Sequence, residues 1–312
     1  MHVPSVGGDA RRRYRRSRRR AAFQPTGRAD RRRGLTAPHA AEVLQQVRDR
    51  LRAASVEVAD REAQWILEAA TGLSRSELLI AQEISNTDTD TALDMAARRA
   101  AGEPLQYITG LAGFRHLELE VGPGVFIPRP ETELVAERAM ELAPHGGKLV
   151  ELGTGSGAIA LACAHERPDL EIWATEVSPE AHDWAVRNRD RLRLKAEIVR
   201  GDLFEGLPAP IQGAVDVIVS NPPYVPEGFN LPRTVADHEP HVALFASDDG
   251  LQVIVTLVNE ARRWLRPGGW LVLEIGEVQR SAVRRILEGA GYSDVEVRLD
   301  MSDRPRIAEA RL

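Results

Sequence analysis

The sequence of 312 residues contains a single cysteine, Cys163, and no apolar run of about 18 residues. One cysteine excludes an internal disulfide framework and any zinc cluster built from cysteines, and it is typical of proteins in reducing compartments. Because no such apolar run exists, we predict no transmembrane helix and expect a cytoplasmic protein without a membrane partner. The eight histidines are scattered, and we predict no metal site. Cys163 lies among small residues of a predicted helix and is expected to pack in the core.

Lysine is absent from residues 1–36, which hold twelve arginines against two acids, Asp9 and Asp30. The other residues carry 29 basic side chains (41 minus 12) and 44 acidic ones (46 minus 2), so the body of the protein is acidic. Because the arginine-rich segment has almost no apolar residues, it is predicted to be disordered, and it does not resemble a secretory signal. Weak contact with RNA or the ribosome is one interpretation of this segment. A dispensable extension is the other, and we favour it.

Residues 37–101 have the periodicity of a small helical domain. Apolar residues within 43–54 recur at helical spacing, and a second helix is predicted to have Asp60 as its N-cap. A short third helix is predicted to open at Ser74, and residues 88–101 supply a fourth. The domain contains no catalytic constellation, so we expect it to recognise a substrate.

Residues 102–125 are predicted to form a β-hairpin that links this domain to the next. Residues 106–108 and 114–121 alternate apolar and polar side chains, with glycines between the two runs. In the segment that follows, 126–133, two prolines flank Arg129. This segment is predicted to be a rigid connector that lines the functional site.

Residues 126–312 alternate predicted strands and helices. The strand candidates are Lys148–Leu152, Glu171–Thr175, Ala196–Arg200, Val215–Ser220 and Trp270–Glu274. This alternation predicts a doubly wound, parallel sheet. Residues 295–299 and 307–312 are two further strands without a helix between them, and they predict one antiparallel pair.

The tetrapeptide Asn221-Pro222-Pro223-Tyr224 follows the strand at residues 215–220, and ligands bind at the carboxyl ends of strands in such sheets. The Asn221 side-chain oxygen and the Pro222 carbonyl could accept both N–H bonds of a planar amide or amine, with Tyr224 against its face. This arrangement suits methylation of a planar nitrogen, whose delocalised lone pair makes it a weak nucleophile. Taken alone, the tetrapeptide is equally consistent with a proline-rich turn.

A glycine-rich turn connects the first strand of this region to a helix, and it consists of Gly153, Thr154, Gly155, Ser156 and Gly157. Glycines at a strand-to-helix turn let the backbone approach a nucleotide closely. The turn also fits the Gly-x-Gly-x-x-Gly/Ala pattern through Ala158. A dehydrogenase therefore remains an alternative at this point.

Two carboxylates follow the next two strands. Glu176 ends the second strand, where a carboxylate binds the ribose hydroxyls of NAD or of S-adenosylmethionine. Asp202 and Leu203 follow the third strand, where they could hold the edge and the face of an adenine. Either acid alone is as readily a solvated side chain or a helix cap. Their positions after consecutive strands favour one ligand site shared with Asn221.

Taken together, these residues resemble the class I S-adenosylmethionine-dependent methyltransferases and, more closely, the release factor glutamine methyltransferase family (PrmC/HemK). The resemblance covers roughly residues 100–312, and it is carried by segments 106–108, 126–133, 153–157, 221–224, 239–240, 243–244 and 250–251. It implies an α/β fold with a Rossmann-like, seven-stranded sheet whose last strand is antiparallel, preceded by a small helical domain. It also implies S-adenosyl-L-methionine as the cofactor. The implied reaction methylates the side-chain amide of the Gln in the Gly-Gly-Gln motif of class 1 peptide chain release factors.

The resemblance assigns roles residue by residue. The cofactor site comprises Gly153, Thr154, Gly155, Ser156, Gly157, Glu176 and Leu203, to which we add Asp202 and Asn221 by position. The target glutamine is held by Asn221, Pro222, Pro223 and Tyr224, with Arg129 as a further substrate-binding candidate. Of these, Asn221, Pro222 and Tyr224 are the predicted catalytic residues. Glu151 and Glu176 stand where the family usually has Asp, which keeps the charge on a longer arm. Leu203 stands where some members carry Trp, which replaces aromatic stacking by aliphatic contact and is expected to weaken cofactor binding.

Four alternatives stay open beside this interpretation. A glutamine methyltransferase of a ribosomal protein would use the same residues. An adenine-N6-type nucleic-acid methyltransferase would need to hold a duplex, which the acidic body disfavours. A dehydrogenase leaves the segment 221–224 unexplained, and a non-enzymatic, ribosome-tethered protein leaves the intact cofactor turn unexplained. We expect a monomer with no specific DNA partner.

Overall fold

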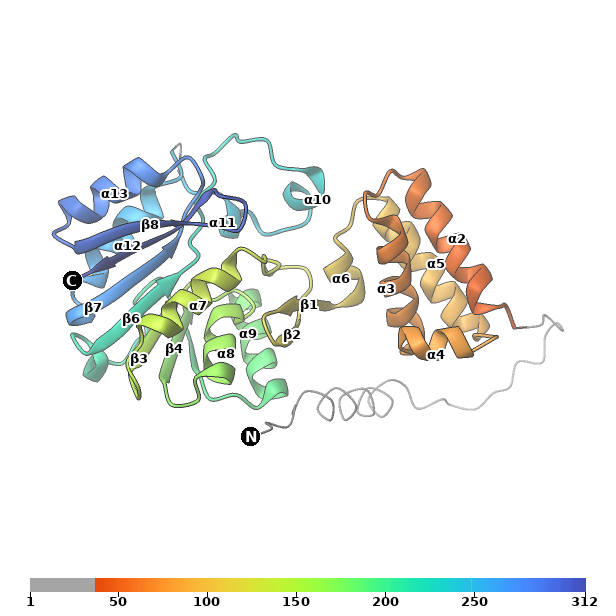
Figure 1. Cartoon of the computed structure of the whole chain (residues 1–312), viewed down its shortest axis with the longest axis horizontal. Coiled ribbons are helices and arrows are strands. Elements are labelled where there is room, and N and C mark those ends of the chain that lie inside the picture. Colours follow the sequence, from red (N-terminus) through yellow and green to blue (C-terminus); the bar gives the residue numbers. More distant parts are fainter. Residues whose placement is uncertain (1–36, 248) are drawn as a thin grey trace. The chain divides into compact units, whose positions relative to one another are not determined.

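The computed structural model of the protein describes residues 37–247 and 249–312 (Figure 1). These residues form two compact units, which divide between Ala101 and Gly102. The predicted arginine-rich tail, residues 1–36, lies outside the described residues. Across the part of the chain that is described, no helix combines the length and the apolar composition that a membrane crossing requires.

The first unit is a helical domain built from α2 (Ala40–Ala53), α3 (Ala59–Thr71), α4 (Arg75–Ile80) and α5 (Asn86–Ala100). Its core consists of small and aliphatic side chains from three of these helices, Val43, Val47, Leu51, Ala63, Ile66, Leu67, Ala92 and Ala96. The buried carboxylate of Glu62 pairs with Arg99 (Oε2 to Nε 2.6 Å) and so joins α3 to α5.

The structure tests the two helix starts that were predicted in this unit. The helix α4 opens at Ser74 as predicted, and Ser74 is its N-cap and forms a capping box with Glu77. The prediction that Asp60 caps α3 is wrong, because α3 already begins at Ala59. Asp60 instead lies in the first turn, where an acid favours the helix dipole, and it pairs with Arg52 at 2.8 Å.

The second unit begins with a helix where a strand was predicted. Residues 106–108 belong to α6 (Leu105–Thr109), so the first strand of the predicted hairpin is wrong. The helix is favoured because it buries Tyr107 and lets its hydroxyl donate a hydrogen bond to the Val125 carbonyl. The hairpin that does form pairs β1 (Leu111–Phe114) with β2 (Leu117–Glu120).

A seven-stranded sheet forms the centre of the second unit, with the strand order β5-β4-β3-β6-β7-β9-β8. Its strands are β3 (Lys148–Leu152), β4 (Glu171–Glu176), β5 (Glu197–Arg200), β6 (Val215–Ser220), β7 (Leu265–Glu274), β8 (Ser293–Leu299) and β9 (Pro305–Arg311). The first five run parallel, and β9 is antiparallel to both of its neighbours, β7 and β8. The predicted sheet with an antiparallel last strand is confirmed.

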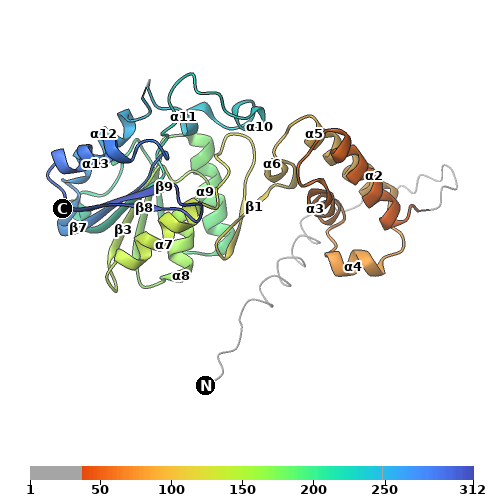
Figure 2. The same cartoon turned by 45° about the horizontal axis from the view of Figure 1, so that its top comes forward.

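Helices cover both faces of the sheet (Figure 2). These helices are α7 (Thr132–Leu142), α8 (Ala158–Glu166), α9 (Pro179–Leu192), α12 (Gln252–Ala261) and α13 (Arg280–Gly289). Alternate residues of the central strands enter two cores. Leu149 and Val217 pack with α7 and α8, whereas Val150 and Ile218 pack with α12 and α13. Burial on both faces explains the continuous apolar runs of these strands, and Cys163 is buried in the first core as expected.

The connections at the carboxyl ends of the parallel strands position the functional site. The glycine-rich turn follows β3, Glu176 ends β4, and Asn221 follows β6. Between β6 and α12 the chain forms two short helices, α10 (Arg233–Ala236) and α11 (His241–Leu244), and a turn of 3-10 helix, η1 (Ala209–Ile211), precedes β6.

Candidate active site

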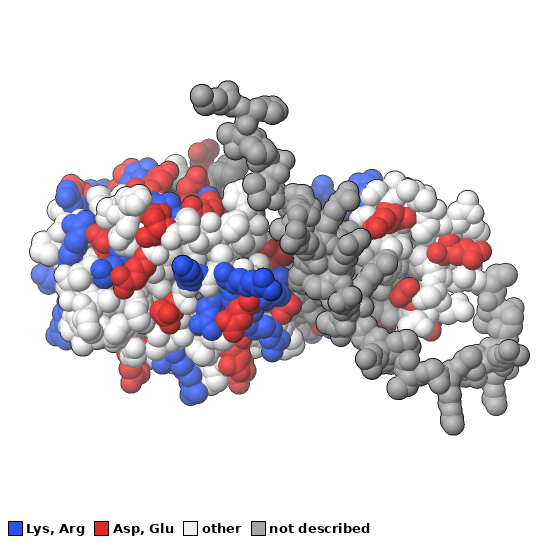
Figure 3. All heavy atoms as spheres, turned by 90° about the horizontal axis from the view of Figure 1, so that it is seen from below, with Lys and Arg blue, Asp and Glu red and all other residues white. Residues whose placement is uncertain are grey.

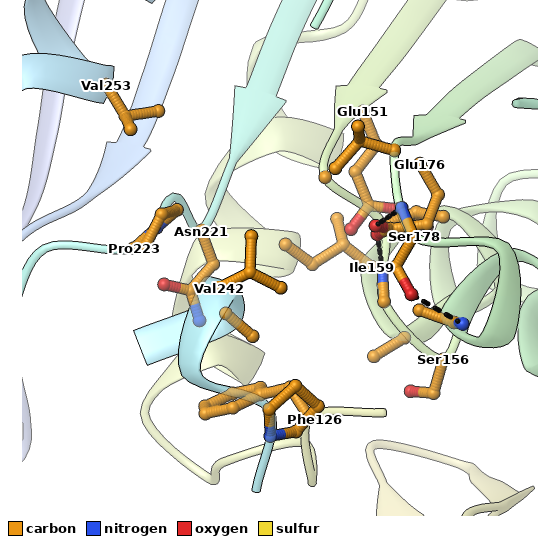
Figure 4. A pocket seen from close by; sticks show the side chains of 18 of the residues that line it. Phe126, Glu151, Ser156, Ile159, Glu176, Ser178, Asn221, Pro223, Val242 and Val253 are labelled. Atoms are coloured by element: carbon orange, nitrogen blue, oxygen red, sulfur yellow. Dashed lines mark hydrogen bonds between the residues drawn. The ribbon is translucent and has the colours of Figure 1, made fainter. Parts of the chain in front are cut away.

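A pocket of about 260 Å³ opens at the carboxyl ends of the parallel strands of the second unit (Figure 4). The predicted site residues that line it are Gly153, Thr154, Gly155, Ser156, Glu176, Asp202, Leu203, Asn221 and Pro223. Those that do not line it are Gly157, Pro222, Tyr224 and Arg129. In Figure 4, Asn221 and Pro223 lie on one side of the pocket, and Glu176 and Ser178 lie on another. The structure therefore brings residues from four separate connections to one cavity.

The glycine-rich turn leaves room beside its backbone. Gly153 and Gly155 have φ angles of 70° and 58°, in the left-handed region that favours glycine, and a Cβ on either would meet no atom within 4 Å. Gly157 differs, because a Cβ there would meet Leu161 Cδ1 at 2.8 Å. The Ser156 hydroxyl is buried and has no hydrogen-bond partner among the described residues. An open backbone cradle with an unsatisfied hydroxyl fits a polar ligand.

Glu176 holds the glycine-rich turn in place. Its carboxylate accepts hydrogen bonds from the backbone N–H groups of Gly155 (2.8 Å) and Ser178 (2.9 Å), and the residue is buried. Leu203, on the next connection, has a φ of 45°, and its carbonyl accepts a hydrogen bond from the Thr175 hydroxyl at 2.6 Å. These bonds fix the walls of the pocket to β4.

Glu151 is a second buried carboxylate under the turn. It accepts hydrogen bonds from the Thr154 hydroxyl (2.5 Å) and from the Ala160 backbone N–H (2.8 Å), which ties the turn to the start of α8. Burial raises the pKa of Glu151 to about 8.

Asn221 and Tyr224 belong to a hydrogen-bonded network that the sequence does not reveal. Asn221 Nδ2 donates to the Thr132 hydroxyl (3.2 Å), which donates to Glu274 Oε2 (2.6 Å). The Tyr224 hydroxyl donates to Glu274 Oε1 (3.1 Å) and accepts from Arg306 Nη1 (3.3 Å). Burial raises the pKa of Tyr224 and also that of Glu274. The only signals for Thr132 and Glu274 were a place in the proline-rich connector and a place at the end of a predicted strand.

The backbone of Tyr224 is held by a hydrogen bond from Gln279. Gln279 Nε2 donates to the carbonyl oxygens of Tyr224 (3.0 Å) and Gly250 (3.2 Å). A Cβ on Gly250, whose φ is 70°, would meet the Tyr224 carbonyl oxygen at 2.2 Å. Glycine at position 250 is therefore required for the close approach of these two loops.

Arg129 connects two walls of the pocket. Its guanidinium lies over the ring of Phe126 (4.6 Å to the centroid) and pairs with Glu239, whose side chain is buried. Glu239 also accepts a hydrogen bond from the Ile127 backbone N–H at 3.0 Å. Phe126 and, next to Glu239, Pro240 line the pocket, so the ion pair holds these two segments together.

The arrangement can bind a nucleotide-like ligand and a planar amide side by side. The glycine-rich turn and the carboxylates offer a backbone cradle and acceptors for hydroxyl groups. At the opposite side of the cavity Asn221 offers a side-chain acceptor for an N–H bond, and Pro222, which follows it in the chain, is not part of the lining. No group in this arrangement needs to form a covalent bond with a substrate.

Comparisons with known proteins identify relatives of both units. Residues 42–110 match the PrmC N-terminal domain, and residues 123–236 match the Methyltransferase small domain. The chain is 42% identical over 281 residues to a release factor glutamine methyltransferase of Streptomyces coelicolor, covering 87% of this chain and 97% of that protein. It is 41% identical over 256 residues to the protein of that name in Escherichia coli, covering 80% of this chain and 91% of the relative.

Solved structures agree with the fold. A methyltransferase from Pyrococcus furiosus aligns with 70% of this chain and 98% of its own, with a TM-score of 0.50 and 22% sequence identity. At that identity the similarity concerns the fold alone. It supports a class I methyltransferase architecture for the second unit.

Proposed function

The chain belongs to the release factor glutamine methyltransferase family, and from this we propose that it methylates class 1 peptide chain release factors. The methyl group would be transferred from the sulfonium sulfur of S-adenosyl-L-methionine, left as a neutral thioether, to the side-chain amide nitrogen of the Gln in the Gly-Gly-Gln motif, which would lose one proton to solvent. One observation carries the proposal, which is that Asn221 and Pro223 border the same pocket as Gly153, Gly155 and Glu176. In this proposal the helical unit recognises the release factor, and the protein acts as a monomer in the cytoplasm.

The residues of the pocket fit S-adenosyl-L-methionine. The open cradle at Gly153 and Gly155 and the unpartnered Ser156 hydroxyl would hold its polar groups. Glu176 and Asp202 would accept hydrogen bonds from hydroxyl and amino groups, and Leu203 would contact the adenine. When bound, this cofactor supplies a methyl group on a positively charged sulfur, which is a strong electrophile.

The chain itself contributes positioning. The Asn221 side-chain oxygen and the Pro222 carbonyl accept the two N–H bonds of the glutamine amide, which directs its nitrogen toward the methyl group. Tyr224 supports this arrangement from outside the pocket lining, through its hydroxyl bond to Glu274. Holding two reactants in register is worth several orders of magnitude in rate, so a weak nucleophile can react without a strong base.

The surface disfavours a nucleic-acid substrate. The residues after position 36 carry 29 basic and 44 acidic side chains (41 minus 12 and 46 minus 2). The face seen in Figure 3 shows acidic side chains among the basic ones, including within the group of basic side chains near the centre of the view. A protein that holds a duplex gathers lysine and arginine along one face.

A parallel labelling experiment tests the proposed function. The purified protein is incubated with radiolabelled S-adenosyl-L-methionine and, separately, with release factors, ribosomal proteins and DNA. We expect label on a release factor and no label when the glutamine of its Gly-Gly-Gln motif is replaced. Label on a ribosomal protein or on DNA, with none on release factors, would replace this proposal by one of the alternatives.

A further inference from the structure

We propose that Thr132 and Glu274 are positioning residues that fix which way the Asn221 side-chain amide faces. The inference rests on the proposed function and deepens it, because it names what orients the group that receives the glutamine. A threonine hydroxyl has one hydrogen, and Thr132 donates it to Glu274 Oε2 at 2.6 Å. Toward Asn221 the same hydroxyl can only accept.

The orientation of Asn221 follows from that restriction. The two ends of an asparagine amide are similar in shape, so its hydrogen-bond partners decide which end faces which way. Only the NH₂ end can donate to the Thr132 hydroxyl, and Asn221 Nδ2 lies 3.2 Å from it. The Asn221 carbonyl oxygen is therefore turned away from Thr132 and remains an acceptor for an incoming N–H group.

Glu274 receives hydrogen bonds from both sides of the tetrapeptide. One carboxylate oxygen accepts from Thr132 and the other accepts from Tyr224 at 3.1 Å. The Tyr224 hydroxyl in turn accepts from Arg306, so its own hydrogen is directed to Glu274. Every bond in this network runs toward the same buried carboxylate, which is only 1% exposed.

The sheet places Glu274 where this role requires it. Ser220 of β6 pairs with Leu273 of β7, so the residues that follow them, Asn221 and Glu274, lie at the carboxyl ends of two neighbouring strands, and Glu274 is still paired with Ile307 of β9. Thr132 lines the pocket and Glu274 does not. Both oxygens of Glu274 are occupied by hydroxyl donors, so Glu274 acts through Thr132 and Tyr224 rather than on the substrate.

The direction of the amide has a consequence for substrate choice. A glutamine side chain offers two N–H bonds, which match the acceptor that Asn221 presents. A glutamate side chain offers only acceptor oxygens at neutral pH, and these cannot form a hydrogen bond with the Asn221 carbonyl oxygen, which is also an acceptor. If Asn221 were free to turn over, its NH₂ end would take the place of the carbonyl oxygen and this discrimination would weaken.

The test replaces Thr132 by Val, which keeps the shape and removes the hydroxyl, and by Ser, which keeps the hydroxyl. Wild-type activity on the release factor is measured first, because its absence would refute the proposed function and not this inference. With active wild type, we expect Thr132→Val to lower kcat about ten- to a hundredfold while the Kd for S-adenosyl-L-methionine stays within about twofold. Thr132→Ser should recover most of the loss. A release factor whose Gly-Gly-Gln glutamine is replaced by glutamate should compete better against Thr132→Val than against wild type.

Two further variants distinguish an effect on the orientation of the Asn221 amide from a loss of folding. Thr109→Val removes a hydroxyl that bonds the Leu105 carbonyl at 3.0 Å in α6, away from the pocket, and should leave kcat unchanged. Glu274→Gln replaces one acceptor oxygen by a donor, so it cannot accept from both hydroxyls, and it should lower kcat even if Thr132→Val fails to fold. Wild-type kcat and unchanged competition in folded Thr132→Val, or no recovery in Thr132→Ser, would overturn the inference.

Discussion

Arg129 and Glu239 form an ion pair between segments 110 residues apart in the sequence. One segment carries Phe126 and the other carries Pro240, and both of these residues line the pocket. Removing the arginine leaves a buried carboxylate whose remaining partner is the Ile127 backbone N–H. We expect Arg129→Met to lower the free energy of unfolding by roughly 2–4 kcal/mol, measured in urea. The control Arg233→Met breaks an exposed pair with Asp237 and should cost less than about 1 kcal/mol.

The same pair distinguishes two roles for Arg129. If it holds the pocket walls together, Arg129→Met and Glu239→Gln should raise the KM for the release factor by similar factors. If Arg129 contacts the release factor directly, as the sequence predicts, only Arg129→Met should raise the KM for the release factor, and Glu239→Gln should not. Steady-state kinetics of the two variants at saturating cofactor decides between these outcomes.

Asn221→Ala removes the side-chain acceptor while leaving the glycine-rich turn intact. We expect kcat to fall by a factor of about a hundred or more, because the glutamine nitrogen is no longer oriented. The Kd for S-adenosyl-L-methionine, measured by calorimetry, should change only a few-fold. Methylation at the wild-type rate by this variant would remove Asn221 from the mechanism.

Gly250→Ala tests the close approach of two loops. A Cβ there would meet the Tyr224 carbonyl oxygen at 2.2 Å and displace the segment that is proposed to hold the glutamine. We expect kcat to fall at least about tenfold, because displacing a positioning group costs orientation. Gly228→Ala is the matched control, since its φ of 80° is also left-handed but its Cβ would meet no atom within 4 Å. Gly228→Ala should lower the free energy of unfolding by about 1–2 kcal/mol and leave kcat unchanged. If both variants lose the same activity, the contact between position 250 and Tyr224 is not the cause.

Glu151 makes stability depend on pH. Burial raises its pKa to about 8 from a usual value of 4.5, so the folded protein retains this proton to higher pH than the unfolded chain does. The stabilising contribution is therefore complete below about pH 4.5 and is lost as the pH rises toward 8. Glu151→Gln cannot ionise, and between pH 5 and 9 its stability should fall less than that of wild type, by on the order of a few kcal/mol.

Unfolding midpoints at each pH provide the measurement. The control Glu197→Gln changes an exposed residue of β5 and should follow the wild-type curve. Parallel curves for wild type and Glu151→Gln would show that Glu151 does not titrate in this range.

The sequence predicts those parts of the site that depend on local pattern and on known sheet geometry. Carboxyl ends of parallel strands lie at one edge, so Glu176, Asp202 and Asn221 could be expected near one another before any coordinates. The glycine-rich turn was predictable for the same reason. Glu176, Asp202 and Asn221 do line one pocket, together with residues 153–156 of the turn.

The parts that could not be predicted depend on partners distant in sequence. Thr132 and Glu274 are 142 residues apart, and neither has a local pattern that indicates the other. Residues 106–108 read as a strand because alternation over three residues is a weak signal. The contact that favours the helix, from Tyr107 to Val125, spans 18 residues.

The position of β9 links the order of protein synthesis to the assembly of the active site. Among the described residues β8 pairs only with β9, and β9 also supplies Arg306, which donates to Tyr224. During translation β8 emerges before its only partner, so a nascent chain that lacks β9 has an open sheet edge beside β7. Tyr224 then lacks its cationic partner as well. The glycine-rich turn after β3 has therefore emerged well before β9, whereas the Tyr224 hydroxyl gains its Arg306 partner only when β9 pairs with β7.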